Sequence, residues 1–170
     1  MIRSALNYLY GDVPARFLSA FSLSESVARL RARTKRSVFA SLLHESAVGP
    51  VGESRVRLQR VIPLFGNSFK PIFVGAFHHE HGRVVLEGRF TMFLFSKIFM
   101  TTWLTFALVW TILAALSVLR ALRGEAMAAL PPLFGIGFFV FGIALVRTSW
   151  WLSRNDIPYL TSVIQAALNQ

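Results

Sequence analysis

Histidine and carboxylate residues gather once in the sequence, at His78-His79-Glu80-His81. Imidazole nitrogens and carboxylate oxygens are ligands for Zn²⁺, which usually takes four ligands in a tetrahedral arrangement. Side chains alternate along a strand, so His79 and His81 would share one side and His78 would lie on the other. The spacing therefore predicts at most a two-ligand metal site at His79 and His81, and a polar hairpin tip is the favoured interpretation.

Other catalytic groups lack a characteristic spacing. The fourth histidine, His44, and the scattered carboxylates show no pattern of a nucleophile beside a base and an orienting acid. The sequence has no Gly-rich phosphate loop of the usual form, and it has no cysteine that could act as a nucleophile. We therefore expect no cofactor and favour a non-enzymatic protein, with a lipid- or metal-dependent membrane enzyme as an alternative.

Two apolar runs without any charge, Ile98–Leu119 and Ala126–Val146, dominate the second half of the chain. A helix of roughly 20 residues crosses the hydrocarbon core of a bilayer, and a chain of 170 residues is too short to bury two such helices in a soluble core. Pro131 and Pro132 suit the first turn of a helix. The pattern predicts a transmembrane hairpin over 98–152, with helices at about 98–119 and 131–152.

Small residues recur on one face of each apolar run, and they let helix backbones approach closely. The residues are Ala107, Thr111 and Ala115 in the first run and Gly135 and Gly142 in the second. These helix–helix packing residues indicate contact within one hairpin or, alternatively, a dimer seam. The short bend between the helices favours the first interpretation.

The chain is strongly basic, with 18 Lys and Arg against 8 Asp and Glu and a net charge of +10. Most of that charge lies before the hairpin, within residues 1–97. The positive-inside rule then predicts that both termini lie in the cytoplasm. Because the anionic inner leaflet is close to any juxtamembrane cation, membrane lipid is favoured over nucleic acid as a partner.

A capping box of Ser22 and Glu25 predicts a helix over about Leu23–Leu43. Its apolar stripe consists of Val27, Leu30, Thr34, Val38 and Leu42. Basic residues on the opposite side of this helix, and two more in the segment that follows, are candidates for binding lipid or a protein partner. These candidates are Arg29, Arg33, Arg36, Arg55 and Arg57. An ordinary solvated helix face is the alternative interpretation.

Alternating apolar residues predict three strands, over about 56–62, 72–77 and 84–92, which form an antiparallel meander. Residues 1–21 are expected to be a loosely structured lead-in. Gly75 and Gly88 would face each other where a packing aromatic, or less favourably a lipid chain, approaches the backbone.

Asn155 and Asp156 are N-cap candidates for an amphipathic C-terminal helix. This helix would pack on the N-terminal region. The predicted fold class is an α+β membrane protein with a cytoplasmic N-terminal region (1–97), the hairpin (98–152) and a cytoplasmic C-terminal helix (153–170).

The stretch from Val61 to Thr102 is similar to a group of small uncharacterised bacterial membrane proteins. The residues that carry this resemblance are Asn67-Ser68-Phe69-Lys70-Pro71, Gly75-Ala76-Phe77, Leu86 to Met92, and Phe95 to Trp103. The resemblance implies a short strand-rich region followed by a two-helix membrane hairpin, and it implies no activity.

Three functional hypotheses follow. The leading one is a non-enzymatic accessory or scaffold protein of the inner membrane that docks a protein partner, or the anionic lipid surface, through its basic domain, with self-association as a further possibility. The alternative is a membrane-resident immunity or inhibitor protein that neutralises a toxin by binding it. The third is the lipid- or metal-dependent enzyme.

Overall fold

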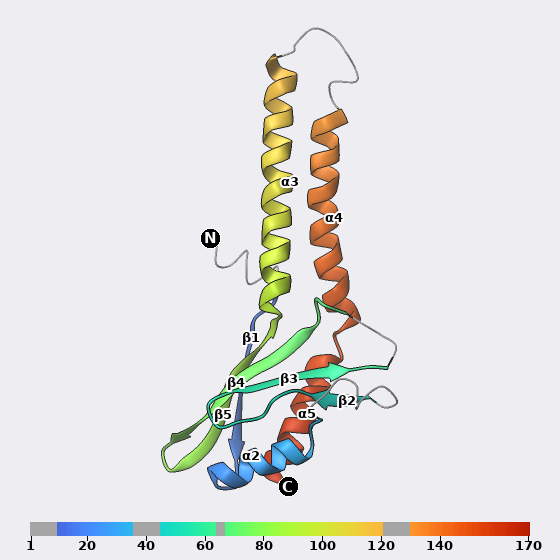
Figure 1. Cartoon of the computed structure of the whole chain (residues 1–170). Helices are drawn as coiled ribbons and strands as arrows, with labels where there is room; N and C mark the ends of the chain where they lie inside the picture. Colours follow the sequence, from blue (N-terminus) through green and yellow to red (C-terminus); the bar gives the residue numbers. More distant parts are fainter. Residues whose placement is uncertain (1–9, 36–44, 64–66, 121–129) are drawn as a thin grey trace. The chain divides into compact units, whose positions relative to one another are not determined.

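A computed structural model describes residues 10–35, 45–63, 67–120 and 130–170. The chain divides into two compact units (Figure 1). One unit combines Met1–Phe93 with Ser149–Gln170, and we call it the sheet unit; the other, Leu94–Thr148, is the helical unit. The sheet unit is therefore built from segments on both sides of the helical unit in the sequence.

The sheet unit contains a five-stranded antiparallel sheet of order β1-β5-β4-β3-β2. The strands are β1 (Val13–Ser19), β2 (Ser46–Val48), β3 (Val56–Val61), β4 (Pro71–Glu80) and β5 (Arg83–Met92). The α+β class is confirmed, whereas the predicted three-stranded meander is wrong in its strand count. Strands β3, β4 and β5 form that meander, and β1 and β2 extend it at the two edges.

The first edge strand, β1, contradicts the prediction of a loosely structured lead-in. It pairs with β5 from Val13↔Phe90 to Ser19↔Val84. Gly11, with a φ of 59°, and Pro14 suggested a loop because both residues usually interrupt a strand. A proline is tolerated on an edge strand, where one side of the backbone has no partner strand, and this explains how Pro14 fits.

Strands β4 and β5 are joined by a tight two-residue turn. Glu80 pairs with Arg83, so only His81 and Gly82 lie between the strands. Both have positive φ, 50° and 75°, as a type I′ hairpin turn requires. His79 and Glu80 therefore belong to β4 and not to the turn in which the sequence placed them.

Helix α2 covers Leu23–Ala32 and ends earlier than predicted. It begins as expected, because the side chain of Ser22 accepts a hydrogen bond from the N–H of Glu25. It ends because the chain turns into the sheet at Lys35, whose N–H donates to the Ala47 carbonyl and which bridges Val48. The rest of the predicted helix, including Arg36, Val38 and Leu42, lies outside the described residues.

The core of the sheet unit lies between one face of the sheet and the helices α2 and α5 (Asp156–Asn169). Helix α5 contributes three side chains that are fully buried: Leu160, Ile164 and Leu168. They pack with Val27 and Leu30 of α2 and with the sheet residues Phe17, Phe73, Leu86 and Phe90. Residues from both ends of the sequence therefore close one hydrophobic core.

Gly75 and Gly88 are direct partners in β4 and β5, as expected. The aromatic side chain over them is Phe73: a Cβ at Gly75 would lie 2.8 Å from its Cζ, and a Cβ at Gly88 2.9 Å from the same atom. The Phe73 ring also contacts those of Phe17 and Phe90 at centroid separations of 5.8 and 5.3 Å. The paired glycines thus create the space that the central core ring occupies.

The helical unit consists of α3 (Leu94–Arg120) and most of α4 (Leu130–Leu152). Both helices are long and apolar enough to cross a membrane. Helix α3 starts at Leu94, earlier than the predicted start at about residue 98, and only Phe93 separates it from β5. The charge-free run begins after Lys97, but the helix includes this lysine in its first turn.

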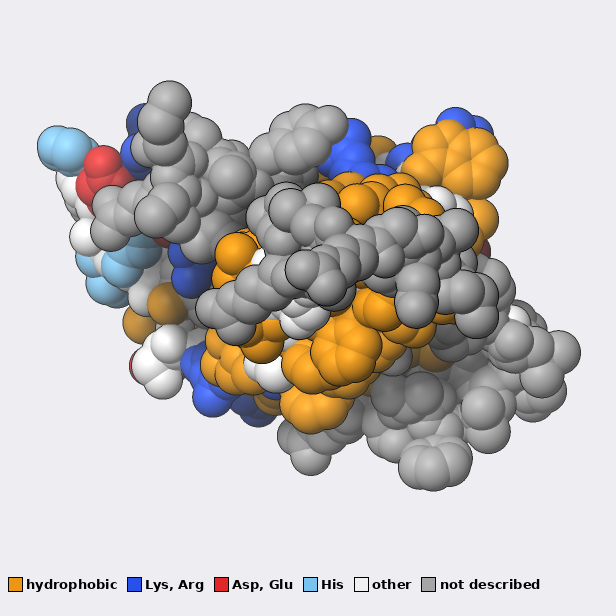
Figure 2. Space-filling view, turned by 90° about the horizontal axis from the view of Figure 1, so that it is seen from above, with side chains coloured by type: hydrophobic (Ala, Val, Ile, Leu, Met, Phe, Trp, Pro, Cys, Tyr) orange, Lys and Arg blue, Asp and Glu red, His pale blue; other side chains and the backbone are white. Residues whose placement is uncertain are grey.

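Large apolar side chains are exposed along both helices. In the two candidate spans only 11% and 17% of the residues are buried. Seen along α3 and α4 in Figure 2, hydrophobic side chains cover much of the described surface. Exposed examples are Phe95 (79%), Phe106 (65%), Phe134 (62%) and Val140 (59%).

Candidate functional site

The histidine cluster forms a polar surface at the end of the β4–β5 hairpin. Nε2 of His78 lies 3.4 Å from Glu87 and 3.7 Å from Glu80, while the Glu80 carboxylate also accepts a hydrogen bond from Arg16. His79 and His81 are exposed. Within the described ranges, no three His, Cys, Asp or Glu side chains are arranged to hold a metal ion.

The arginines of α2 are more engaged than the sequence pattern indicated. Nε of Arg29 donates to Oε1 of Glu25 at 2.9 Å, and its guanidinium lies 3.7 Å from the centre of the Phe21 ring. Arg33 donates to the side chain of Gln170 at 3.4 Å. Arg29 and Arg33 therefore both have side-chain partners within the chain, whereas Arg36, the third predicted residue of this basic face, lies outside the described residues.

Another group of cations lies on the sheet face opposite α2 and α5, which we call the polar face. Arg57 in β3 and Arg89 in β5 both pair with Val74 of β4, so they occupy one row across three strands. Arg57 stacks on Phe93, with its Cζ 4.6 Å from the ring centre. Arg89 is paired instead, 3.8 Å from Asp12.

A second stacked guanidinium follows α4. Cζ of Arg154 lies 5.3 Å from the ring centre of Trp151. Arg57 and Arg154 thus stack on the aromatic residue just before α3 and on one in the last turn of α4. Neither forms an ion pair with a described residue. The aromatic residue at each helix end is the sequence signal that could have indicated this pair, but Arg57, the partner of Phe93, is distant from it in the sequence.

A partly buried group of charges connects the start of α5 to β3. Arg60 donates to Glu45 at 2.9 Å and to the buried carboxylate of Asp156 at 3.1 Å, and its guanidinium lies 5.0 Å from the Tyr159 ring centre. Nζ of Lys70 donates to the Arg60 carbonyl at 2.5 Å. The sequence suggested Asp156 only as an N-cap, and its partner is 96 positions away.

The space beside these charges is too small for a ligand. It measures about 10 Å³, close to the minimum for a single water molecule. Burial raises the pKa of Asp156, although Arg60 opposes that effect, and burial lowers the pKa of Lys70. The charges therefore act as a structural connection between α5 and the sheet.

Stability should depend on pH through Asp156. Because the folded state binds the Asp156 proton more tightly, this residue's contribution is fully present below its ordinary pKa of 3.8 and is lost as pH rises through the raised value. We expect the free energy of unfolding of the wild type to fall relative to Asp156→Asn across that window. Denaturant titrations of the full-length protein in mild detergent at several pH values measure the difference.

Glu53→Gln is the matched control, since it removes an exposed carboxylate. Its stability should stay parallel to that of the wild type over the same pH range. A wild-type curve parallel to that of Asp156→Asn would contradict the assignment of the pH dependence to this carboxyl group.

Close contact between α3 and α4 depends on glycine. A Cβ at Gly135 would lie 2.2 Å from Oγ1 of Thr111, and one at Gly142 would lie 3.1 Å from the Trp103 ring. Nε1 of Trp103 donates to the Phe138 carbonyl at 3.3 Å, and Ala107 is 2% exposed. These small residues therefore lie in the contact within one chain; Ala115 is half-buried.

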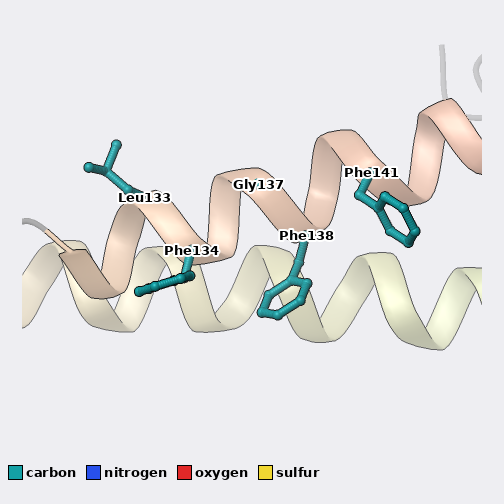
Figure 3. Close-up of a pocket in the computed structure, with 5 residues that line it drawn as sticks. All are labelled: Leu133, Phe134, Gly137, Phe138 and Phe141. Carbon is teal, nitrogen blue, oxygen red and sulfur yellow. The ribbon is translucent and has the colours of Figure 1, made fainter.

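A shallow apolar groove of about 540 Å³ runs along α4 (Figure 3). Its lining consists of Leu133, Phe134, Gly137, Phe138 and Phe141. Figure 3 shows the Phe134 and Phe138 side chains directed toward the neighbouring helix, with the bare backbone of Gly137 between them. No polar side chain lines this groove, so it has no group that could orient a polar ligand.

No protein-family model, curated protein or solved structure matches the chain. The resemblance to small two-helix membrane proteins therefore stays a prediction. A proposal for the function has to rest on the two units and their side chains.

Proposed function

We propose that the protein is an integral protein of the bacterial inner membrane whose α3–α4 hairpin crosses the bilayer and whose sheet unit is a docking domain. The observation that carries this proposal is the exposed apolar surface of the two helices. The central helix of a soluble protein would be mostly buried, whereas only 11% and 17% of these spans are. A bilayer supplies the apolar surroundings that such side chains need.

The composition of the sheet unit supports a topology. Its core combines Phe73 and Phe90, which precede the hairpin, with Leu160 and Ile164, which follow it. Both flanks of the hairpin must then lie on the same side of the membrane. The basic charge before the hairpin supports a cytoplasmic location for that side under the positive-inside rule.

The proposed role is non-enzymatic docking of a protein partner or of the anionic lipid surface. The sheet unit carries exposed basic residues, among them Arg89 and Arg154. Short connections hold this unit near the bilayer, because one residue separates β5 from α3 and three separate α4 from α5. A basic domain held in this way is attracted to anionic headgroups or acidic partners within a Debye length of the surface.

Single-cysteine labelling tests the topology cleanly, because the natural chain has no cysteine. We expect Ser24→Cys in α2 and Ser162→Cys in α5, both exposed, to react with an impermeant maleimide only after cells are opened. Gly124→Cys, between the two helices in sequence, should react in intact cells. The protein should also stay in the membrane pellet after alkaline carbonate extraction.

Release by carbonate would reject the membrane proposal. Opposite accessibility of positions 24 and 162 would reject the hairpin topology, because the two residues could not then belong to one sheet unit. Val140→Cys, at an exposed apolar position in α4, is the control and should remain unlabelled in the bilayer under both conditions.

A further inference from the structure

We propose that Arg57 and Arg154 bind the phosphate groups of anionic phospholipids in the leaflet next to the sheet unit. This inference rests on the proposed membrane function and names the partner of its basic domain. It concerns two arginines that each stack on an aromatic ring at an end of the hairpin.

The chain positions of the two rings place them at headgroup depth. Phe93 immediately precedes Leu94, the first residue of α3, and Trp151 is in the last turn of α4. Aromatic side chains at the ends of transmembrane helices lie where the hydrocarbon meets the headgroups. A guanidinium stacked on such a ring lies at the depth of the lipid phosphates.

The hydrogen-bonding state of the two arginines favours an external anion. A guanidinium has five N–H donors in a planar fork that matches the oxygens of a phosphate. Arg29 and Arg60 direct such donors to carboxylates of this chain. Arg57 and Arg154 have no such carboxylate among the described residues, and stacking leaves the N–H groups at the guanidinium edge available.

Neighbouring charge adds to the attraction for an anion. Arg89 lies in the same row of the polar face as Arg57, and it is three residues, or about 10 Å, from the end of β5. Asp12 at 3.8 Å offsets part of its charge, so Arg89 is a weaker candidate for direct binding. Headgroup phosphates are favoured over an acidic protein because the bilayer supplies them at this depth.

Lipid retention by the full-length protein tests the inference. The protein is reconstituted in vesicles of equal amounts of phosphatidylglycerol and phosphatidylcholine, extracted in mild detergent, and its bound lipids are quantified by mass spectrometry. We expect the wild type to retain phosphatidylglycerol preferentially. Arg57→Gln with Arg154→Gln should reduce that preference by about 25-fold, since each juxtamembrane cation contributes roughly a fivefold preference.

Arg16→Gln with Arg83→Gln is the matched control. It removes the same charge from two exposed arginines, one of them at the far end of β5 from α3. The control should keep the preference for phosphatidylglycerol. An equal loss in both double variants would overturn the inference, because it would show that net charge alone selects the lipid.

Arg57→Lys with Arg154→Lys distinguishes a loss of lipid binding from a folding defect, because it preserves both positive charges. This double variant should keep much of the retention of phosphatidylglycerol. Loss equal to that of the glutamine pair would reject phosphate binding in favour of a folding defect. Unchanged retention in the glutamine pair, with the protein still resistant to carbonate, would reject only the lipid site. Extraction of the wild type by carbonate would instead reject the membrane proposal.

Discussion

Gly88→Val is expected to prevent the sheet unit from reaching its native fold. A Cβ at position 88 would lie 2.4 Å from the Val74 carbonyl oxygen and 2.6 Å from Cα of Gly75, so it meets backbone that cannot rotate away. Overpacking of a core typically costs 1–3 kcal/mol, and a β-branched side chain against backbone should cost about 3 kcal/mol or more. Trypsin resistance and thermal unfolding of the full-length protein in detergent measure the loss.

Glu87→Val is the control that tests whether the loss of stability in Gly88→Val comes from the position of the substitution and not from valine as such. Residue 87 is next in the same strand and exposed on the polar face. Its replacement should change the free energy of unfolding by no more than about 0.5 kcal/mol. A second variant, Gly88→Val with Phe73→Leu, should remain as unstable as Gly88→Val; recovery would show that the ring, and not the backbone, excludes the side chain.

Gly135→Leu is expected to separate α3 from α4 in the helical unit. The new side chain would begin 2.2 Å from Oγ1 and 3.1 Å from Cα of Thr111. Separation would break the hydrogen bonds from Trp110 to the Pro131 carbonyl and from Trp103 to the Phe138 carbonyl. We expect a loss of about 3 kcal/mol, measured by thermal unfolding in mild detergent with tryptophan emission as the signal.

Gly137→Leu is a close control, two residues further along the same helix. Nothing lies within 4 Å of a Cβ at this position, and leucine has the higher helix propensity. Stability should therefore be unchanged or slightly increased. Equal destabilisation by both substitutions would argue against a specific contact between Gly135 and α3.

The sequence predicted the elements whose patterns are local. Alternation identified the strands that contain Val56, Phe73 and Leu86, and a run without charge identified both long helices. The capping residue Ser22 marked the start of α2 correctly. Strand β1 was missed because Pro14 is acceptable only where a strand has a free edge, and the edge exists only after the sheet has formed.

Side-chain partners could not be predicted in the same way. The helical pattern placed Arg29 and Arg33 on one face but did not indicate that Arg29 would pair with Glu25 and stack on Phe21. Arg60 meets Asp156 across 96 positions, and no local period encodes such a distance. Candidate binding residues therefore depend on the tertiary fold more than the secondary structure does.

The split composition of the sheet unit also constrains the order of biosynthesis. The strands that hold Phe73 and Phe90 leave the ribosome first, whereas Leu160, Ile164 and Leu168 of α5 emerge last. At 5–20 residues per second the interval is on the order of 10 s. Throughout that interval the growing chain presents an unfinished apolar face, and the core is completed only after both long helices have been synthesised. Until α5 emerges, this face is open to aggregation and to proteolysis.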